Sequence, residues 1–278
     1  MRLGGQVFID NITPDKWVKK LQEKNYRAAV FPVDHTASDE EIASYQKAAE
    51  YADIVISEVG AWSNPISPDP EVRKAAIEHC KNQLRLADKV RADVCVNISG
   101  SRGEEWDAPH PDNFSQATFD LIVETVQEII DDVNPQHTFY ALEMMPWALP
   151  DDTEQYLALI KAIDRPKFAV HFDPVNMLNS PRKVYRNGEL IEEFFEKLGP
   201  YTKTAHAKDI ALSSELTTHL SEEIPGEGIL DYDAFLRGMD KLGPDVPLMM
   251  EHLDTEEKYD RATAFIRKKA AELGIKLS

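Results

Sequence analysis

The stretch KFAVHFDPVN, residues 167–176, is a run of β-prone apolar residues that ends in a carboxylate, Asp173. Three other runs have the same form, and they end in Glu143, His206 and Glu251. A polar residue at the end of a buried strand is costly unless it is paired, hydrogen-bonded or bound to a metal. Four such residues, separated by 30, 33 and 45 positions, therefore predict a common site.

Short apolar or β-branched runs alternate with longer helical patterns along the chain. The runs predict strands at residues 6–10, 27–33, 53–59, 92–99, 138–144, 168–173, 202–207 and 247–252. Eight strand–helix repeats fit an α/β protein of the (β/α)8 TIM-barrel class. No linker or shift in composition divides the chain, so we expect a single domain over residues 1–278. The first turn, IDNITPDKW, contains no glycine, which disfavours a doubly wound nucleotide-binding sheet.

The barrel gives the four polar residues a location. Active sites of such barrels lie at the C-terminal ends of the strands, and the four residues end the last four predicted strands. Because alternate strand residues face the same side, His171 shares a face with Asp173, and Lys208 shares one with His206. The polar segment 211–228 is expected to be a long loop over this site.

Composition limits the partners. With 31 Lys and Arg against 49 Asp and Glu, the net charge is −18, which disfavours nucleic acid and anionic membranes. Cys80 and Cys95 are too few for a disulfide framework, so we expect both to be reduced and buried. No signal peptide or membrane span is recognisable, and the expected location is cytoplasmic.

Three carboxylates and one imidazole form an oxygen-rich ligand set. Such a set favours one divalent ion, Mn²⁺ first and Mg²⁺ or Co²⁺ as alternatives, over structural Zn²⁺. A metal there would polarise a substrate carbonyl and stabilise an enediolate as a neighbouring proton leaves. Glu143 and Glu251 are the candidate acid–base pair. Returning the proton to the other face gives epimerisation, returning it to the adjacent carbon gives isomerisation, and losing a β-hydroxyl gives dehydration.

Further candidates for substrate binding lie nearby in the predicted barrel. They are His171, Lys208, Arg102 and Trp62, the last two in segments that follow predicted strands. Each has a competing structural interpretation: a packed histidine, a salt-bridged lysine, a surface arginine and a tryptophan packed in its loop.

These residues together resemble a known family. Glu143, FDPVN, HAKD, MEH and the PGEGILDYDAFL segment at 225–236 resemble, in order and position, the xylose-isomerase-like sugar phosphate isomerase/epimerase superfamily. The resemblance covers essentially the whole chain. It implies a TIM barrel in which Glu143, Asp173, His206 and Glu251 hold the metal and the two glutamates transfer protons.

The positions around the metal depart from one branch of that family. Tagatose and psicose 3-epimerases carry a histidine three positions after the Asp ligand, where this chain has Asn176. Their substrate-binding glutamate and arginine are replaced here by Leu149 and Leu212. Asn176 is therefore a further substrate-binding candidate, and epimerisation of a free ketohexose is not implied.

Several functions fit these observations. The first hypothesis is an isomerase or epimerase of a ketose or keto-sugar, acting on a small sugar or keto-polyol without a phosphate. A lyase, either an inosose-type dehydratase or one that eliminates an aglycone from a 3-keto-glycoside, uses the same chemistry. An endonuclease IV-like phosphodiesterase is disfavoured, because it needs more histidines and a basic face. A non-catalytic sugar-binding barrel and a homo-oligomer both remain open.

Overall fold

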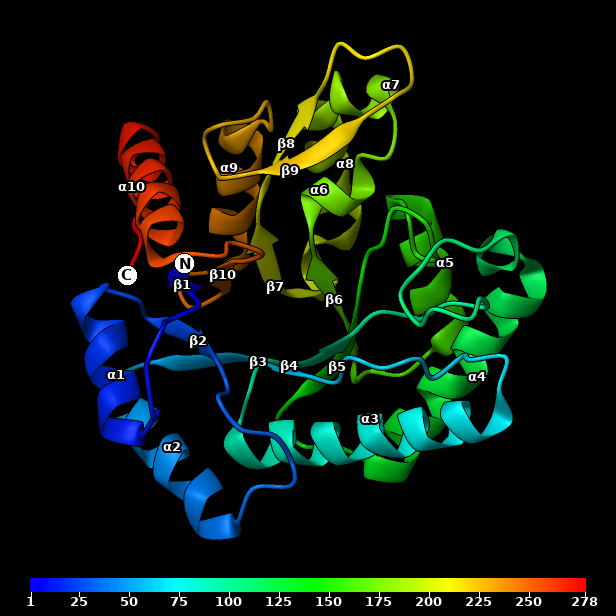
Figure 1. Ribbon diagram of the computed structural model, residues 1–278, viewed down its shortest axis with the longest axis horizontal. Helices are drawn as coiled ribbons and strands as arrows, with labels where there is room; N and C mark the ends of the chain where they lie inside the picture. The colour runs from blue at the N-terminus through cyan, green and yellow to red at the C-terminus, as the bar shows by residue number, and fades with distance from the viewer.

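Eight parallel strands close into a barrel in the order β1-β10-β7-β6-β5-β4-β3-β2 (Figure 1). The computed structural model describes residues 1–278. The barrel strands are β1 (Arg2–Gly5), β2 (Ala28–Val30), β3 (Val55–Gly60), β4 (Val94–Asn97), β5 (Phe139–Glu143), β6 (Phe168–Phe172), β7 (Thr202–Ala207) and β10 (Pro247–Met250). The predicted (β/α)8 barrel is confirmed.

Helices surround the barrel and follow its strands in the chain (Figure 1). They are α1 (Pro14–Glu23), α2 (Asp39–Tyr51), α3 (Pro70–Val90), α4 (Gln116–Val133), α5 (Thr153–Ile163), α6 (Pro174–Met177), α7 (Pro181–Val184), α8 (Asn187–Leu198), α9 (Tyr232–Leu242) and α10 (Glu256–Glu272), with short 3₁₀ segments at Pro111–Phe114 and Gly199–Tyr201. Most begin at a side-chain cap; Ser38, for example, accepts a hydrogen bond from the N–H of Glu41. None of the helices is both long and apolar enough to cross a lipid bilayer.

The first strand differs from the prediction. Residues 6–10 were expected to form it, but the strand is Arg2–Gly5, and residues 6–10 lie beyond its C-terminal end. A Cβ at Gly4 would stand 2.3 Å from the carbonyl oxygen of Ala28, the residue paired with it in β2. Glycine lets the two backbones approach closely. Because glycine has a low strand propensity, the strand could not be recognised from the sequence.

Most of the core is one continuous apolar cluster of 60 buried residues, and Val94, Val96 and Ala141 form a second, small cluster. Phe172 of β6 stacks on Phe194 of α8, with ring centroids 3.5 Å apart and planes 11° apart. Cys80 and Cys95 are buried and free, as expected. This packing fixes the barrel strands, and therefore the residues at their ends, in rigid positions.

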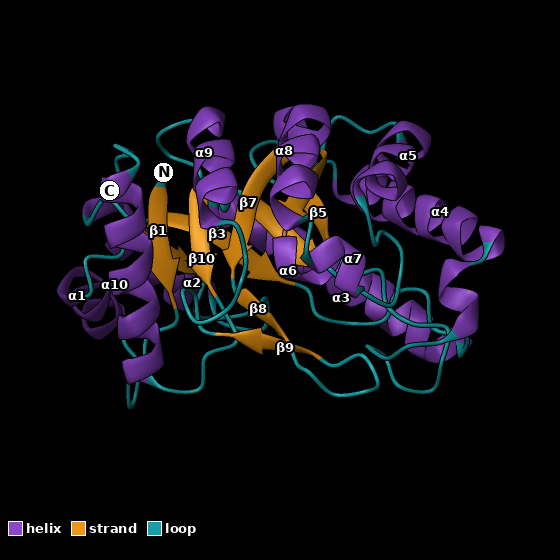
Figure 2. Ribbon diagram, turned by 90° about the horizontal axis from the view of Figure 1, so that it is seen from above, coloured by secondary structure: helices purple, strands orange, loops and turns teal.

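A two-stranded hairpin lies beside the C-terminal ends of the barrel strands (Figure 2). It pairs β8 (Asp209–Leu212) with β9 (Leu220–Glu223), so the prediction of a long loop over 211–228 is wrong in part. The Asp209 carboxylate accepts hydrogen bonds from the N–H groups of Gly226 and Leu230, which holds the following segment against the hairpin. The segment is too polar for its strands to be recognised from hydrophobic alternation.

Candidate functional site

Four side chains that can bind a metal meet at the C-terminal rim of the barrel. Glu143 ends β5, Asp173 follows β6, His206 lies in β7 and Glu251 follows β10. Their donor atoms lie within 4.8 Å of one another. The four strands are consecutive in the barrel, so the ends of neighbouring strands bring together residues that are up to 108 positions apart in the sequence.

Asp173 is held by the backbone that follows it. One carboxylate oxygen, Oδ1, accepts hydrogen bonds from the N–H groups of Val175 and Asn176 at the start of α6. This is an N-cap, which fixes the side chain and leaves the second oxygen free to face the site. That second oxygen, Oδ2, is fully buried and has no hydrogen-bond partner.

His206 stands between the carboxylates. Its Nδ1 lies 2.8 Å from Glu251 Oε2 and 3.3 Å from Glu143 Oε1. Burial alone would lower the pKa of His206, but Glu251, Glu58 and Glu143 together raise it well above the ordinary value. The imidazole is therefore in contact with negative charge on both sides of its ring.

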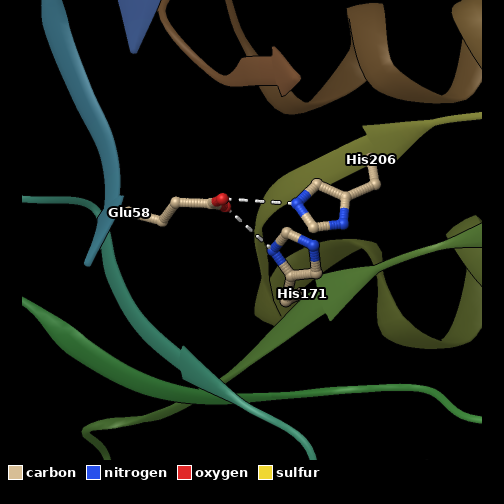
Figure 3. Close-up of side chains that lie close together, drawn as sticks. All are labelled: Glu58, His171 and His206. Carbon is tan, nitrogen blue, oxygen red and sulfur yellow. Dashed lines mark hydrogen bonds and ion pairs between the residues drawn. The ribbon is translucent and has the colours of Figure 1, made fainter. Parts of the chain in front are cut away.

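Glu58 supplies the contact on the other side of the ring, and sequence reasoning missed it. Figure 3 shows its carboxylate reaching from β3 toward His206 and His171. Glu58 Oε1 lies 3.3 Å from His206 Nε2, and Oε2 lies 3.7 Å from His171 Nδ1. A glutamate in the middle of a buried strand, in the run DIVISEV, is itself a signal, because such a charge needs a buried partner.

His171 packs beneath the site. Its ring lies edge-on to His206 with centroids 3.9 Å apart, and its Nδ1 is 2.6 Å from Thr204 Oγ1. Burial and the neighbouring His206 hold the pKa of His171 well below its ordinary value. Its position favours a supporting role under His206 over direct contact with substrate.

Lys208 places an ammonium group among the carboxylates. Its Nζ lies 2.7 Å from Asp173 Oδ2 and 2.7 Å from Glu251 Oε2, although neither approach has hydrogen-bond geometry. Glu222 of the hairpin is 3.3 Å away. Burial alone would lower the pKa of Lys208, but Asp173 and Glu251 raise it well above the ordinary value. The neighbouring carboxylate, Asp209, accepts hydrogen bonds from backbone N–H groups instead of pairing with Lys208.

The surroundings of Glu143 and Glu251 shift the pKa values of the two carboxyl groups in opposite directions. Burial, followed by the charge of Glu251, raises the pKa of Glu143. Burial also acts to raise the pKa of Glu251, but His206 and Lys208 outweigh it and hold that pKa well below its ordinary value. Two carboxylates with opposite pKa shifts share one site.

The residues present fit a divalent cation. Buried oxygens of Asp173 and Glu251 lack hydrogen-bond partners, and carboxylates with one imidazole are the donor types that Mn²⁺, Mg²⁺ and related ions accept. The negative charge is only partly balanced by Lys208 and His206. An additional positive charge at this position would therefore be stabilised.

Two cavities open onto these residues. The first cavity, about 480 Å³, lies over the ends of β1, β2 and β10, with Glu58, His206 and Glu251 among its lining residues. The second cavity, about 540 Å³, is lined by Trp62, Ile98, Trp106, Asp107, Glu143, Met145, Pro146, Trp147, Asn176, Glu222, Glu251 and His252. Both include Trp62, Glu251 and His252, so the cavities are neighbours that meet at the site.

Of the remaining residues predicted to bind substrate, some line the two cavities and others do not. Asn176 donates a hydrogen bond to Glu143 Oε1 at 3.1 Å and lines the second cavity, and Trp62 lines both cavities. Arg102 lines neither, because its guanidinium donates to the carbonyl oxygen of Ile66. His171 lines neither as well.

Comparisons with known proteins agree with this architecture. A family model described as "Xylose isomerase-like TIM barrel" matches residues 18–269. No curated protein sequence matches the chain at a significant level.

Solved structures share the fold at low sequence identity. D-psicose 3-epimerase with D-tagatose from Clostridium cellulolyticum H10 is 16% identical, with TM-score 0.73 over 98% of this chain and 99% of that chain. The probable 3-DHS dehydratase from Bacillus anthracis is 16% identical, with TM-score 0.70 over 96% and 97%. A xylose isomerase-like TIM barrel protein from Mycobacterium smegmatis in complex with magnesium is 16% identical, with TM-score 0.68 over 98% and 97%. At this identity the likeness concerns the fold.

Proposed function

This chain belongs to the xylose isomerase-like TIM barrel family, and from that premise we propose that it is a divalent-metal-dependent isomerase or epimerase of a keto-sugar. The single observation that carries the proposal is the convergence of four donor atoms, from Glu143, Asp173, His206 and Glu251, within 4.8 Å. The family relationship supports an enzyme of this general kind, and the donor set supports a metal-dependent one.

The four residues would hold one divalent cation. We favour Mn²⁺, with Mg²⁺ or Co²⁺ as alternatives, because three of the four donors are carboxylates. The magnesium in the structure from Mycobacterium smegmatis is consistent with an ion of this class. When bound, the cation would polarise a substrate carbonyl and stabilise the enediolate formed when a neighbouring proton is removed.

Glu143 and Glu251 are the groups we assign to proton transfer. Each has two carboxylate oxygens, so one can face the cation while the other faces substrate. They come from β5 and from the end of β10, with Asp173 and His206 on the strands between them. This arrangement lets one glutamate take a proton from carbon while the other supplies one at a second position.

The residues around the four donors are assigned to substrate binding. Asn176 and Trp62 line the second cavity directly, and Lys208 presents its ammonium beside Asp173 and Glu251. An amide, an indole and an ammonium can bind hydroxyl groups, the face of a sugar ring and a carbonyl oxygen respectively.

A lyase is the alternative that a specific observation favours. The structure from Bacillus anthracis, which shares this fold, is described as a probable dehydratase. Elimination of a β-hydroxyl or an aglycone begins with the same removal of a proton next to a carbonyl, so the same two glutamates would serve it.

Metal titration tests the basis of the proposal. Purified protein stripped of metal should bind one equivalent of Mn²⁺ in isothermal titration calorimetry. Asp173→Asn should weaken that binding by about tenfold or more, since a carboxylate ligand is lost. Asp107→Asn is the matched control, because Asp107 lines the second cavity, as Glu143 and Glu251 do, but is outside the four-residue cluster. A wild-type protein that binds no divalent ion would contradict the proposal.

A further inference from the structure

Lys208 faces more carboxylates than its single positive charge can balance. Its Nζ lies 2.7 to 3.8 Å from carboxylate oxygens of four residues, which are Glu143, Asp173, Glu222 and Glu251. Three of the four belong to the cluster assigned to the cation, and Glu222 is the exception. Glu222 is therefore the one carboxylate that a bound cation would leave available to Lys208.

The two shortest of these approaches end on atoms that a cation would need. Asp173 Oδ2 and Glu251 Oε2 each lie 2.7 Å from Nζ of Lys208, and both oxygens are buried without a hydrogen-bond partner. An ammonium group and a divalent cation that face the same two oxygens repel each other, and this repulsion is strong at short range. Lys208 should therefore withdraw from Asp173 and Glu251 when a cation enters the cluster.

Glu222 stands where the ammonium group can go. Its Oε1 lies 3.3 Å from Lys208 Nζ, so a small rotation about the last bonds of the lysine side chain would bring the two groups into full contact. Lys208 is only 2% exposed, and a buried ammonium group that loses its partners is costly unless another carboxylate replaces them. The move toward Glu222 is thus the change that keeps Lys208 paired.

The same glutamate connects the hairpin to the barrel. Glu222 makes the only side-chain ion pairs of β9, one to Lys208 directly after β7 and one to His252 after β10 (Figure 2). Its Oε2 lies 3.0 Å from His252 Nδ1. Leu216, in the turn of the hairpin, is fully exposed and adds no contact. The strength of the Lys208–Glu222 pair therefore affects how firmly β9 is held against the site.

We propose that Lys208 exchanges partners when a divalent cation binds: it leaves the carboxylates of the cluster and pairs with Glu222, which fixes the hairpin against the metal site. This inference rests on the proposed function and adds Glu222 to it as a positioning residue. Glu222 lines the second cavity with Glu143 and Glu251, whereas Lys208 lines neither of the two cavities at the site. The change of partner thus brings the ammonium group toward the space in which substrate would bind.

Hydrogen–deuterium exchange, followed by mass spectrometry, tests the change of partner. In the wild type, saturating Mn²⁺ should make peptides that cover β8 and β9 exchange severalfold more slowly, because the hairpin is held more firmly. Glu222→Gln and Lys208→Met, each saturated with Mn²⁺, should lose most of this added protection, since either change removes the pair. Protection that survives in Glu222→Gln would overturn the proposal. Protection that survives in Lys208→Met would assign the contact to His252 and overturn it as well.

Glu223→Gln is the matched control for the hairpin variant. Glu223 is next to Glu222 on β9 and carries the same charge, but it has no ion-pair partner. The control should keep the gain in protection that Mn²⁺ gives the wild type. A loss equal to that in Glu222→Gln would show that the charge of the hairpin, and not the pair with Lys208, is responsible, and it would overturn the proposal.

Calorimetry on the same samples gives a second readout. Glu222→Gln should weaken Mn²⁺ binding several fold more in the wild-type background than in the Lys208→Met background, because only a protein with the lysine needs Glu222 to receive it. Equal effects in the two backgrounds would overturn the proposal. A wild type that binds no Mn²⁺ would contradict the proposed function and this inference with it. Bound Mn²⁺ without added protection of the hairpin would overturn this inference alone.

Discussion

Glu58 Oε1 lies 3.3 Å from His206 Nε2, on the side of the imidazole ring opposite the nitrogen that faces Glu143 and Glu251. Histidines that bind metals commonly donate their other N–H to a carboxylate, which fixes the tautomer and the orientation of the ring. Glu58 is thereby assigned as a positioning residue for His206, although it lies outside the four-residue cluster.

Removing the Glu58 carboxylate should therefore weaken metal binding. We expect Glu58→Ala to reduce Mn²⁺ affinity by about 10- to 100-fold, as loss of such a carboxylate does elsewhere. Glu58→Gln should retain more affinity, because its amide oxygen can still accept a hydrogen bond from Nε2. Calorimetry gives the affinities, and circular dichroism of the metal-free proteins checks that each variant folds. Wild-type affinity in Glu58→Ala would refute the role.

Glu251→Gln should abolish turnover and leave the fold intact. The amide keeps the shape of the side chain but cannot transfer a proton, and acid–base catalysis contributes roughly 10²- to 10⁴-fold to a rate. Steady-state kinetics on any substrate that the protein turns over would measure the loss. The matched control is Glu223→Gln, a hairpin glutamate that lines neither of the two cavities at the site. A fully active Glu251→Gln enzyme would show that another residue carries the proton.

Lys208→Met should strengthen metal binding. In the wild type the ammonium lies 2.7 Å from oxygens of both Asp173 and Glu251, so a cation must share those oxygens with it. Without Lys208 we expect Mn²⁺ to bind about tenfold or more tightly, because electrostatic competition for the carboxylates is removed.

The same variant should be less stable without metal. Breaking a buried ion pair costs about 3–5 kcal/mol, and Mn²⁺ should restore the loss. Thermal unfolding with and without Mn²⁺ measures both effects. Lys203→Met, on the same strand but in the cavity at the opposite face of the barrel, is the control. Weaker Mn²⁺ binding in Lys208→Met would argue that the lysine assists the metal.

Asp93, at the opposite face of the barrel, should make stability depend on pH. Burial raises its pKa to about 7, and Lys203 opposes the shift only in part. Between about pH 4 and pH 7 the folded state then holds a proton that the unfolded state releases, so stability falls as pH rises through this window.

Asp93→Asn removes that dependence. The variant should gain stability relative to the wild type at pH 8 and not at pH 3.5, by at most about 4 kcal/mol, and by less because Asp93 remains partly exposed. Urea unfolding of both proteins across this range gives the difference. Parallel pH curves for the two proteins would show that the carboxyl titrates normally.

Much of the site could be predicted from the sequence because its donors end strands. Glu143, Asp173, His206 and Glu251 each follow an apolar run, and the rule that barrel sites lie at strand C-termini then predicts their convergence. The order of the runs suggests that the four strands are neighbours, but the 4.8 Å separation of the donor atoms depends on side chains that reach inward from a closed barrel.

Other features depend on contacts that no local pattern encodes. Glu58 lies inside a strand, and its role appears only when β3 faces β6 and β7 across the barrel interior. Strand β1 was misplaced because Gly4 replaces the usual β-prone residues to let two backbones meet. Arg102 was expected near substrate, but the backbone carbonyl of Ile66 holds its guanidinium. The role of Glu58, the position of β1 and the contact of Arg102 therefore all depend on tertiary packing.

Solvent exchange tests the central claim most directly. The Mn²⁺-loaded protein is incubated in D₂O with ketopentoses, ketohexoses, their phosphates, inososes and 3-keto-glycosides, and each is followed by NMR. The account predicts deuterium at a carbon next to the carbonyl of at least one unphosphorylated member, with no exchange in Glu251→Gln. The labelled product would also distinguish isomerase, epimerase and lyase. No exchange in any member, by protein shown to hold its metal, would contradict the account.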